Sequence, residues 1–84
     1  MSDYSHPAFR FGFRNESGEN ITVTLSAAGA DATSFGLSPM ESTVVVFPVK
    51  HASFTAIYDS GGSCGSPMSN RQTAVITVDS WYIE

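Results

Sequence analysis

The chain contains one cysteine, Cys64, and its sulfur is the strongest candidate nucleophile in the sequence. It lies within Gly-Ser-Cys-Gly-Ser, where flexible backbone N–H groups could stabilise an oxyanion. A reactive thiolate also needs a base that lowers its pKa, and His6 and His51 are the only imidazoles. A loop rich in Ser and Gly holds such a constellation poorly, because catalytic groups need rigid supports. The sequence therefore predicts that the protein is not an enzyme, and a thiol-dependent enzyme using Cys64 is the second alternative.

Metal-ligating and acidic side chains give no stronger signal. Two His and one Cys are too few and too scattered for a zinc spacing, and Asp59 lacks the regular oxygen-ligand spacing of a calcium loop. Glu16 and Glu19 share one turn, but hydrolysis by paired carboxylates needs a cleft that a small domain hardly provides. We predict no metal and no cofactor.

Charge excludes one class of partner. Eight Asp and Glu against four Lys and Arg give a net charge of −4, so the chain is acidic. Binding of nucleic acid needs a dense cationic footprint, and the basic residues are scattered along the sequence. They are Arg10, Arg14, Lys50 and Arg71.

The N-terminal segment and the longest apolar run indicate where in the cell the protein is located. The longest apolar run, residues 44–49, is much shorter than a membrane span. Residues 1–7 have neither the basic nor the apolar stretch of a signal peptide, and we expect them to form a loose N-terminal leader. These features predict a cytoplasmic protein without a membrane span, with secretion left open. A single cysteine allows no internal disulfide.

The elements that position these residues are predicted to be strands. Ile21-Thr22-Val23-Thr24-Leu25 alternates apolar and polar residues, and successive side chains of a strand point to opposite faces. Residues 8–15 show the same rhythm with three Phe on one face, and we expect the two segments to pair as a hairpin. No segment has the 3.6-residue apolar period of a helix.

Further strands follow the same signals. We expect a third at residues 34–37, a fourth at 43–49, a fifth at 53–59 and a long final strand or bent pair at 73–84. Pro48 cannot donate to a ladder, so we expect the fourth strand to lie at a sheet edge or to end there. Two loops are predicted, at residues 28–33 and, rich in Ser and Gly, at residues 60–71.

About six strands with regular turn signals predict an all-β fold with no substantial helix. We expect a small antiparallel β-sandwich, immunoglobulin-like or a partly closed barrel, formed by residues 1–84 as a single domain. The stretch Leu37-Ser38-Pro39-Met40-Glu41-Ser42-Thr43-Val44 resembles a strand–turn–strand junction common in immunoglobulin-like modules. That resemblance implies a sandwich and no site residues.

Surplus apolar surface is the remaining clue to function. Residues 44–49 are apolar on both faces, and a bare Val-rich edge strand is an aggregation hazard unless something covers it. Trp81 and Tyr82 lie near the end of the sequence. Aromatic residues of this kind often contribute most of the binding energy of an interface. We predict a small non-enzymatic binding protein that acts through a protein–protein surface, as an inhibitor, an accessory factor or a subunit of an assembly, and that could self-associate. The candidate contact residues are Val45, Phe47, Val49, Cys64, Met68, Arg71, Trp81 and Tyr82.

A glycan- or small-ligand-binding module is the first alternative. Aromatic and amide side chains on sandwich loops can stack on sugars and form hydrogen bonds with them. The candidate residues for this function are Tyr58, Asp59, Asn70, Trp81 and Tyr82.

Overall fold

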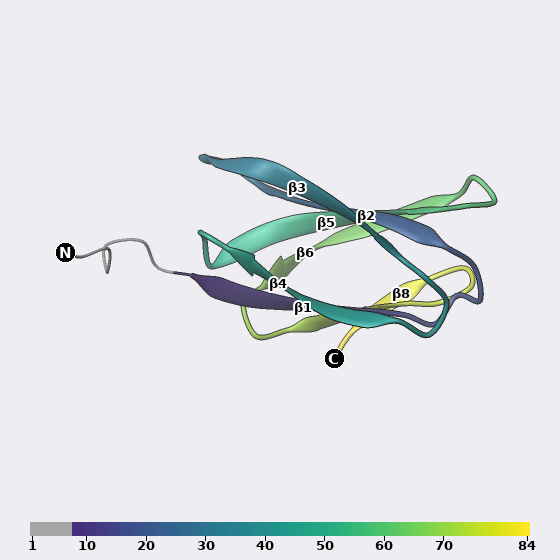
Figure 1. Ribbon diagram of the computed structural model, residues 1–84. Coiled ribbons are helices and arrows are strands. Elements are labelled where there is room, and N and C mark those ends of the chain that lie inside the picture. The colour runs from purple at the N-terminus through teal and green to yellow at the C-terminus, as the bar shows by residue number, and fades with distance from the viewer. Residues whose placement is uncertain (1–7) are drawn as a thin grey trace.

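Segments in which apolar and polar residues alternate form most of the strands of this protein. The structure is a computed structural model that describes residues 8–84. The predicted leader, residues 1–7, lies outside the described residues. Within residues 8–84 the fold is all-β and contains no helix, as predicted (Figure 1). The strands are β1 (Phe9–Asn15), β2 (Ile21–Ala27), β3 (Ala30–Leu37), β4 (Ser42–Phe47), β5 (His51–Tyr58), β6 (Ser63–Ser69), β7 (Thr73–Ile76) and β8 (Trp81–Ile83).

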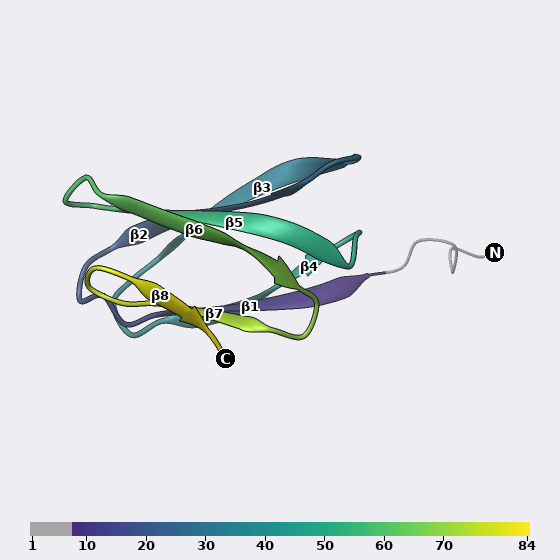
Figure 2. The ribbon, with the colours of Figure 1, turned by 180° about the vertical axis from the view of Figure 1, so that it is seen from behind.

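The strands form two packed four-stranded sheets, and this confirms the sandwich. One sheet has the order β4-β1-β7-β8 and the other β3-β2-β5-β6 (Figures 1 and 2). The prediction that the first two strands pair as a hairpin is wrong, because β1 and β2 lie in different sheets. β1 and β2 each have one apolar face, and these two faces bury more surface by meeting across the core than by lying side by side in one sheet.

One strand pair departs from the predicted antiparallel arrangement. β1 runs parallel to β7, with Gly12 beside Thr73 and Arg14 beside Val75. All other pairs are antiparallel. The chain crosses between the sheets before β7 returns to β1, so β7 enters from the same end of the sandwich as β1.

The number of strands also differs, because the structure has eight where about six are predicted. The predicted Ser/Gly loop at residues 60–71 contains strand β6, which pairs with β5 along its whole length. Small residues suit this strand, since a Cβ on Gly65 would lie 2.5 Å from the carbonyl oxygen of Phe54. The predicted loop at residues 28–33 mostly belongs to β3.

The end of the chain is the bent pair that was one of two expectations. β7 and β8 form an antiparallel hairpin in which Ile76 pairs with Trp81. β4 ends at Phe47 and occupies a sheet edge, as Pro48 predicts.

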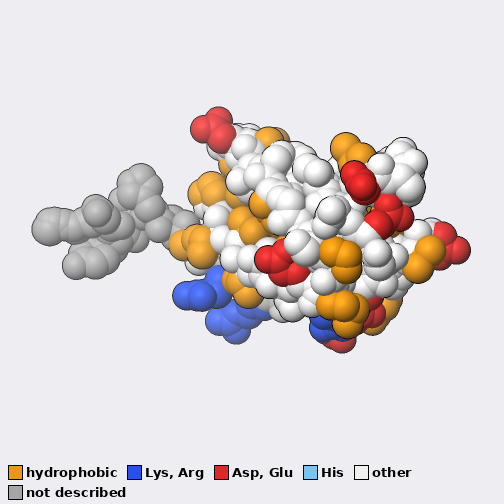
Figure 3. Space-filling view, turned by 45° about the vertical axis from the view of Figure 1, so that its right-hand side comes forward, with side chains coloured by type: hydrophobic (Ala, Val, Ile, Leu, Met, Phe, Trp, Pro, Cys, Tyr) orange, Lys and Arg blue, Asp and Glu red, His pale blue; other side chains and the backbone are white. Residues whose placement is uncertain are grey.

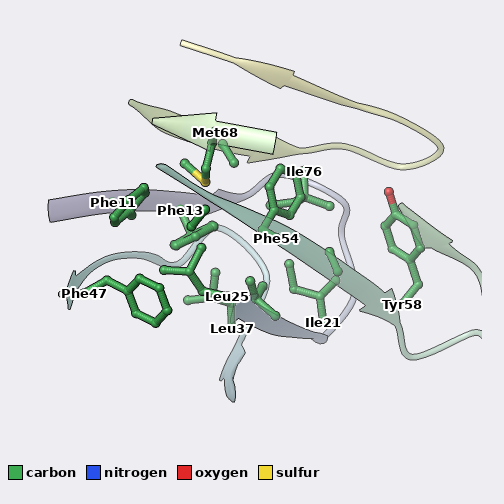
Figure 4. Packing of buried hydrophobic residues seen from close by; sticks show 14 residues of the cluster. Phe11, Phe13, Ile21, Leu25, Leu37, Phe47, Phe54, Tyr58, Met68 and Ile76 are labelled. Carbon is green, nitrogen blue, oxygen red and sulfur yellow. The ribbon is translucent and has the colours of Figure 1, made fainter. Parts of the chain in front are cut away.

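Aromatic side chains from both sheets fill the core (Figure 4). Phe13 lies edge-on to Phe35 at 5.3 Å and to Phe54 at 5.9 Å between ring centroids. Phe11 meets Phe47 in the same way at 6.0 Å. Edge-to-face geometry is a favoured arrangement of aromatic pairs. The two contacts of Phe13 join the sheets, whereas Phe11 and Phe47 lie on neighbouring strands of one sheet.

Candidate binding surface

The outer face of β4 carries the most exposed pair of adjacent apolar residues on a strand. Val44 is 59% exposed and Val46 is 58% exposed, and both point away from the core. β4 is an edge strand, so the backbone on its outer side has no strand partner in the described chain. Apolar side chains beside unpaired backbone groups are the features by which sheet edges recruit another strand.

A shallow groove runs beside these valines over Gly12 of β1. It has a volume of about 410 Å³ and lies between β4 and β7 on the outer face. A Cβ on Gly12 would come within 2.5 Å of Thr73 Oγ1, so glycine is the residue that fits here without displacing its neighbour. The groove is lined by Gly12, Phe13, Arg14, Ser42, Thr43, Val44 and Thr73.

On the outer face of β7, neighbouring side chains cover the apolar residue Val75. Val75 points outward and yet is completely buried, in register between Arg14 and Tyr82. Arg14 donates to Glu16 at 2.8 Å and to Glu84 at 3.1 Å. These two carboxylates, that of Glu84 above all, raise the pKa of the Arg14 guanidinium. Val44 and Val46 are therefore the most exposed apolar strand residues of this face, ahead of Tyr82 on β8 at 46%.

Three of the four basic residues, scattered in the sequence, lie together in the fold. Arg10, Lys50 and Arg71 line one hollow with a volume of about 430 Å³ at the end of the sandwich where β1 begins. Figure 3 shows Lys and Arg side chains grouped at the lower left of the molecule. A second, shallower hollow over Gly12 shares Arg10 and Arg71 with this one, so the cationic end adjoins the β4 surface.

The predicted contact residues divide by burial. Phe47 and Met68 are buried core residues, so their side chains are not available to a partner. Arg71 and Tyr82 are exposed, the first at the cationic hollow and the second on the outer face of β8. Four more are half-buried and pack against the core: Val45, Val49, Cys64 and Trp81.

The described residues do not bring an imidazole to Cys64. Cys64 pairs with Ala56, whereas His51 is five residues earlier on β5, about 17 Å along the strand. His6 lies outside the described residues. The nearest side-chain partner of the sulfur is the hydroxyl of Tyr58 at 3.6 Å, and burial raises the pKa of Tyr58. A phenol that holds its proton is not a base for this thiol.

The proposed sugar-binding residues are brought together only in part, because the Tyr58 hydroxyl lies 3.2 Å from Ser80 O, next to Trp81, whereas Asn70 lies far from both. Tyr58 is buried, and its hydroxyl donates to the carbonyl of Thr77 at 2.7 Å. Asn70 follows β6 at the opposite end of β5, about 24 Å away along the strand. Trp81 packs edge-on against Phe54 in the core at 6.1 Å between ring centroids, so no open stacking platform forms from these side chains.

Residues 8–84 contain no group of three or more His, Cys, Asp or Glu side chains arranged to hold a metal. The same part of the chain has no helix long and apolar enough to cross a membrane. Comparison of the chain with known protein families, with curated proteins and with solved structures finds no match.

Sequence reasoning selected Val45 and Phe47, whose side chains face the core, and did not select Gly12, Arg10 or Lys50. Phe47 is the bulkiest side chain of the strand and so marks its core face by parity, which leaves Val44 and Val46 outside. That signal was present in the sequence. The convergence of the cations depends on which turns meet at one end of the sandwich, and a linear pattern does not contain that information.

Proposed function

We propose that this chain is a non-enzymatic binding protein that acts through the outer face of β4. The observation that carries the proposal is the pair Val44 and Val46, more than half exposed on a strand whose outer edge is unpaired in the described chain. Single exposed apolar residues are ordinary, but two on one edge strand beside a groove form a contact surface. The groove over Gly12 gives side chains of a partner a place next to the valines.

The occupant we propose is an extended strand of another polypeptide that adds to β4. Main-chain hydrogen bonds to the edge would provide affinity, and apolar side chains at every second position would contact Val44 and Val46. Arg10 is directly opposite Val46 in the register, so a partner carrying acidic residues near that end is favoured. A cytoplasmic setting is part of the proposal and is supported by the single cysteine, since oxidising compartments favour paired ones.

Photo-cross-linking from two positions tests this surface. A photoreactive phenylalanine analogue is placed at position 46 on β4 and, as control, at position 34 on β3, which is the edge strand of the opposite sheet. Val46 and Ser34 are both exposed and point outward, so the two probes differ in the face that they sample. We expect one defined cross-linked polypeptide from position 46 and none from position 34.

Variants of the valines complete the test. Val44→Thr with Val46→Thr, made in the chain without the photoreactive residue, keeps the shape and the strand propensity and removes apolar surface, so it should abolish binding of the polypeptide that the cross-link identifies while the protein stays folded. Ile57→Thr makes a comparable change at a 49% exposed position on the other sheet and should leave that binding intact. Equal products from both probe positions, or no loss in the double variant, would contradict the proposal. Cross-linking of the purified protein to itself would identify a second copy as the partner.

A further inference from the structure

Three cationic side chains from three separate parts of the fold converge on one hollow. Arg10 comes from β1, Lys50 from the β4–β5 turn and Arg71 from the β6–β7 turn. Backbone hydrogen bonds hold these segments together, because Arg71 N donates to Arg10 O at 2.7 Å and Asn70 N donates to Lys50 O at 2.8 Å. The convergence is therefore a property of the backbone and does not depend on chance orientations of long side chains.

These cations have no carboxylate partner within residues 8–84. All salt bridges of the described chain involve Arg14, which pairs with Glu16 and Glu84. The hollow itself contains no acidic side chain, since it is lined by Ala8, Phe9, Arg10, Lys50, Asn70 and Arg71. Like charges that share a site repel one another, and an anion placed among them relieves that repulsion.

Acidic residues gather at the opposite end of the sandwich. Asn15 N donates to Glu41 O at the end of β1 in one sheet, Asp59 N donates to Asn20 O at the end of β5 in the other, and the β1–β2 connection joins these two ends. Five acidic residues belong to the connections at that end: Glu16, Glu19, Glu41, Asp59 and Asp79. A chain of net charge −4 thus keeps a local excess of positive charge at one end.

Arg71 occupies a backbone conformation that side chains rarely adopt. Its φ is +70°, in the left-handed region where Gly or Asn is the usual residue. A strained conformation at a surface turn that presents a guanidinium to a hollow points to a role for that side chain.

We propose that this hollow binds a phosphate-type oxyanion, either free phosphate or the phosphate group of a small monoester. Two guanidinium groups offer paired N–H donors that match pairs of phosphate oxygens, and Lys50 adds a point charge. The side-chain amide of Asn70 adds a neutral donor. Three positive charges suit a dianion better than a single carboxylate. The site goes beyond the proposed contact surface and does not depend on it.

Amide chemical shifts of the isotopically labelled full chain test the site. Inorganic phosphate is titrated against sodium chloride at matched ionic strength, so that general screening is subtracted. We expect saturable shifts at residues 10, 50, 70 and 71 with phosphate and not with chloride. Lys50→Gln and Arg71→Gly should each weaken binding about tenfold, the effect of losing one charged hydrogen-bond partner. Arg71→Gly also relieves the left-handed backbone, so a loss of binding there does not reflect a misfolded turn.

Arg14→Gln is the matched control, because it removes an arginine of the same strand whose charge is already paired with Glu16 and Glu84. Phosphate affinity should not change in this variant. The proposal is overturned by shifts that do not exceed those with chloride, or by an equal loss of affinity in Arg14→Gln. Methyl phosphate separates the two sources, since tighter binding than phosphate indicates a monoester and equal binding indicates the free ion. Val44→Thr with Val46→Thr should leave phosphate binding intact, so the anion site and the contact surface can fail separately.

Discussion

The side-chain amide of Asn15 in β1 donates a hydrogen bond to the carbonyl oxygen of Leu37 in β3, 3.1 Å away and in the opposite sheet. The same amide donates to Glu19 O at 2.7 Å, and its oxygen accepts from the N–H and the hydroxyl of Ser17. Asn15 has no solvent exposure. A fully buried polar side chain whose donors and acceptors are all satisfied fixes the crossing from one sheet to the other.

Replacing Asn15 by Ala should therefore lower the free energy of unfolding by about 2–3 kcal/mol, because the Leu37 carbonyl would lose this donor and the buried Ser17 N–H would lose its acceptor. Urea denaturation measures this change. Asn20→Ala, at an exposed position at the other end of the same turn, is the control and should change the free energy by less than about 0.5 kcal/mol. Equal effects of the two substitutions would show that the Asn15 network does not stabilise the crossing.

Gly12 is confined by Thr73 on the outer face, and this contact can be tested as a pair. Gly12→Ala should lower the free energy of unfolding by about 1–2 kcal/mol, since the new Cβ meets Thr73 Oγ1. Thr73→Ala in the same chain should restore most of the loss, and a double-mutant cycle by thermal denaturation measures this coupling. Additive effects of the two substitutions would contradict the close packing of the two residues.

Replacing Arg71 by glycine should stabilise the protein, because Arg71 has a left-handed backbone conformation. Arg71→Gly should increase the free energy of unfolding by about 0.5–1 kcal/mol, because Gly adopts positive φ without a steric penalty. Met40, whose φ is +65°, provides a second position of the same kind, and Met40→Gly should give a gain of similar size. Chemical denaturation of both variants checks the prediction. A loss of stability only in Arg71→Gly would mean that the guanidinium stabilises the fold.

Tyr58 should make stability depend on pH in the alkaline range. Burial raises the pKa of its hydroxyl above the ordinary value of about 10. The folded state holds this proton more tightly than the unfolded state, so its contribution is complete below pH of about 10 and is lost as pH rises through the higher folded pKa. Urea denaturation at several pH values should show this decline.

The matched variant is Tyr58→Phe. It should lose about 1 kcal/mol at neutral pH, because the hydrogen bond to the Thr77 carbonyl disappears. It should also show a smaller alkaline decline in the free energy of unfolding than the wild type. Identical declines in the two proteins would refute the assignment of this pH dependence to Tyr58.

Local alternation was sufficient to predict the fold class and most core faces. Phe11 and Phe13 of β1, Val23 and Leu25 of β2, and Phe54 of β5 are buried at the positions that period-two spacing indicates. The pattern works here because each sheet has one face in the core and one outside, so burial alternates along the strand. The strand–turn–strand junction that residues 37–44 resemble is also present, since Glu41 N donates to Ser38 O at 3.0 Å between β3 and β4.

Pairing between strands could not be read from the same pattern. Asn15 resembles an ordinary turn residue in the sequence, and only its burial between the sheets shows that β1 and β2 separate there. Strand β6 was missed because Ser and Gly are typical of loops. In this fold they suit an edge strand that lies close to the backbone of β5, with Cys64 and Met68 turned toward the core.

The candidate site was predicted only in part. The sequence prediction and our proposal share the strand β4, but the sequence analysis selected Phe47 and Val45, whereas Val44 and Val46 face outward. Arg71 was selected as part of the predicted loop at residues 60–71, but Arg10 and Lys50, which line the same hollow, were not selected. Which turns of a sandwich meet at one end is decided by strand order, and strand order depends on contacts between residues far apart in the sequence.

Hydrogen exchange of the β4 amides tests the central claim most directly. The protein is measured alone and in complex with the polypeptide that cross-links through position 46, and protection is compared strand by strand. Addition of a partner strand should slow exchange at the amides of residues 42–47 that point away from β1, and leave the edge strand β3 unchanged. Unchanged exchange along β4, or protection confined to β3 or β6, would contradict a binding function at this edge.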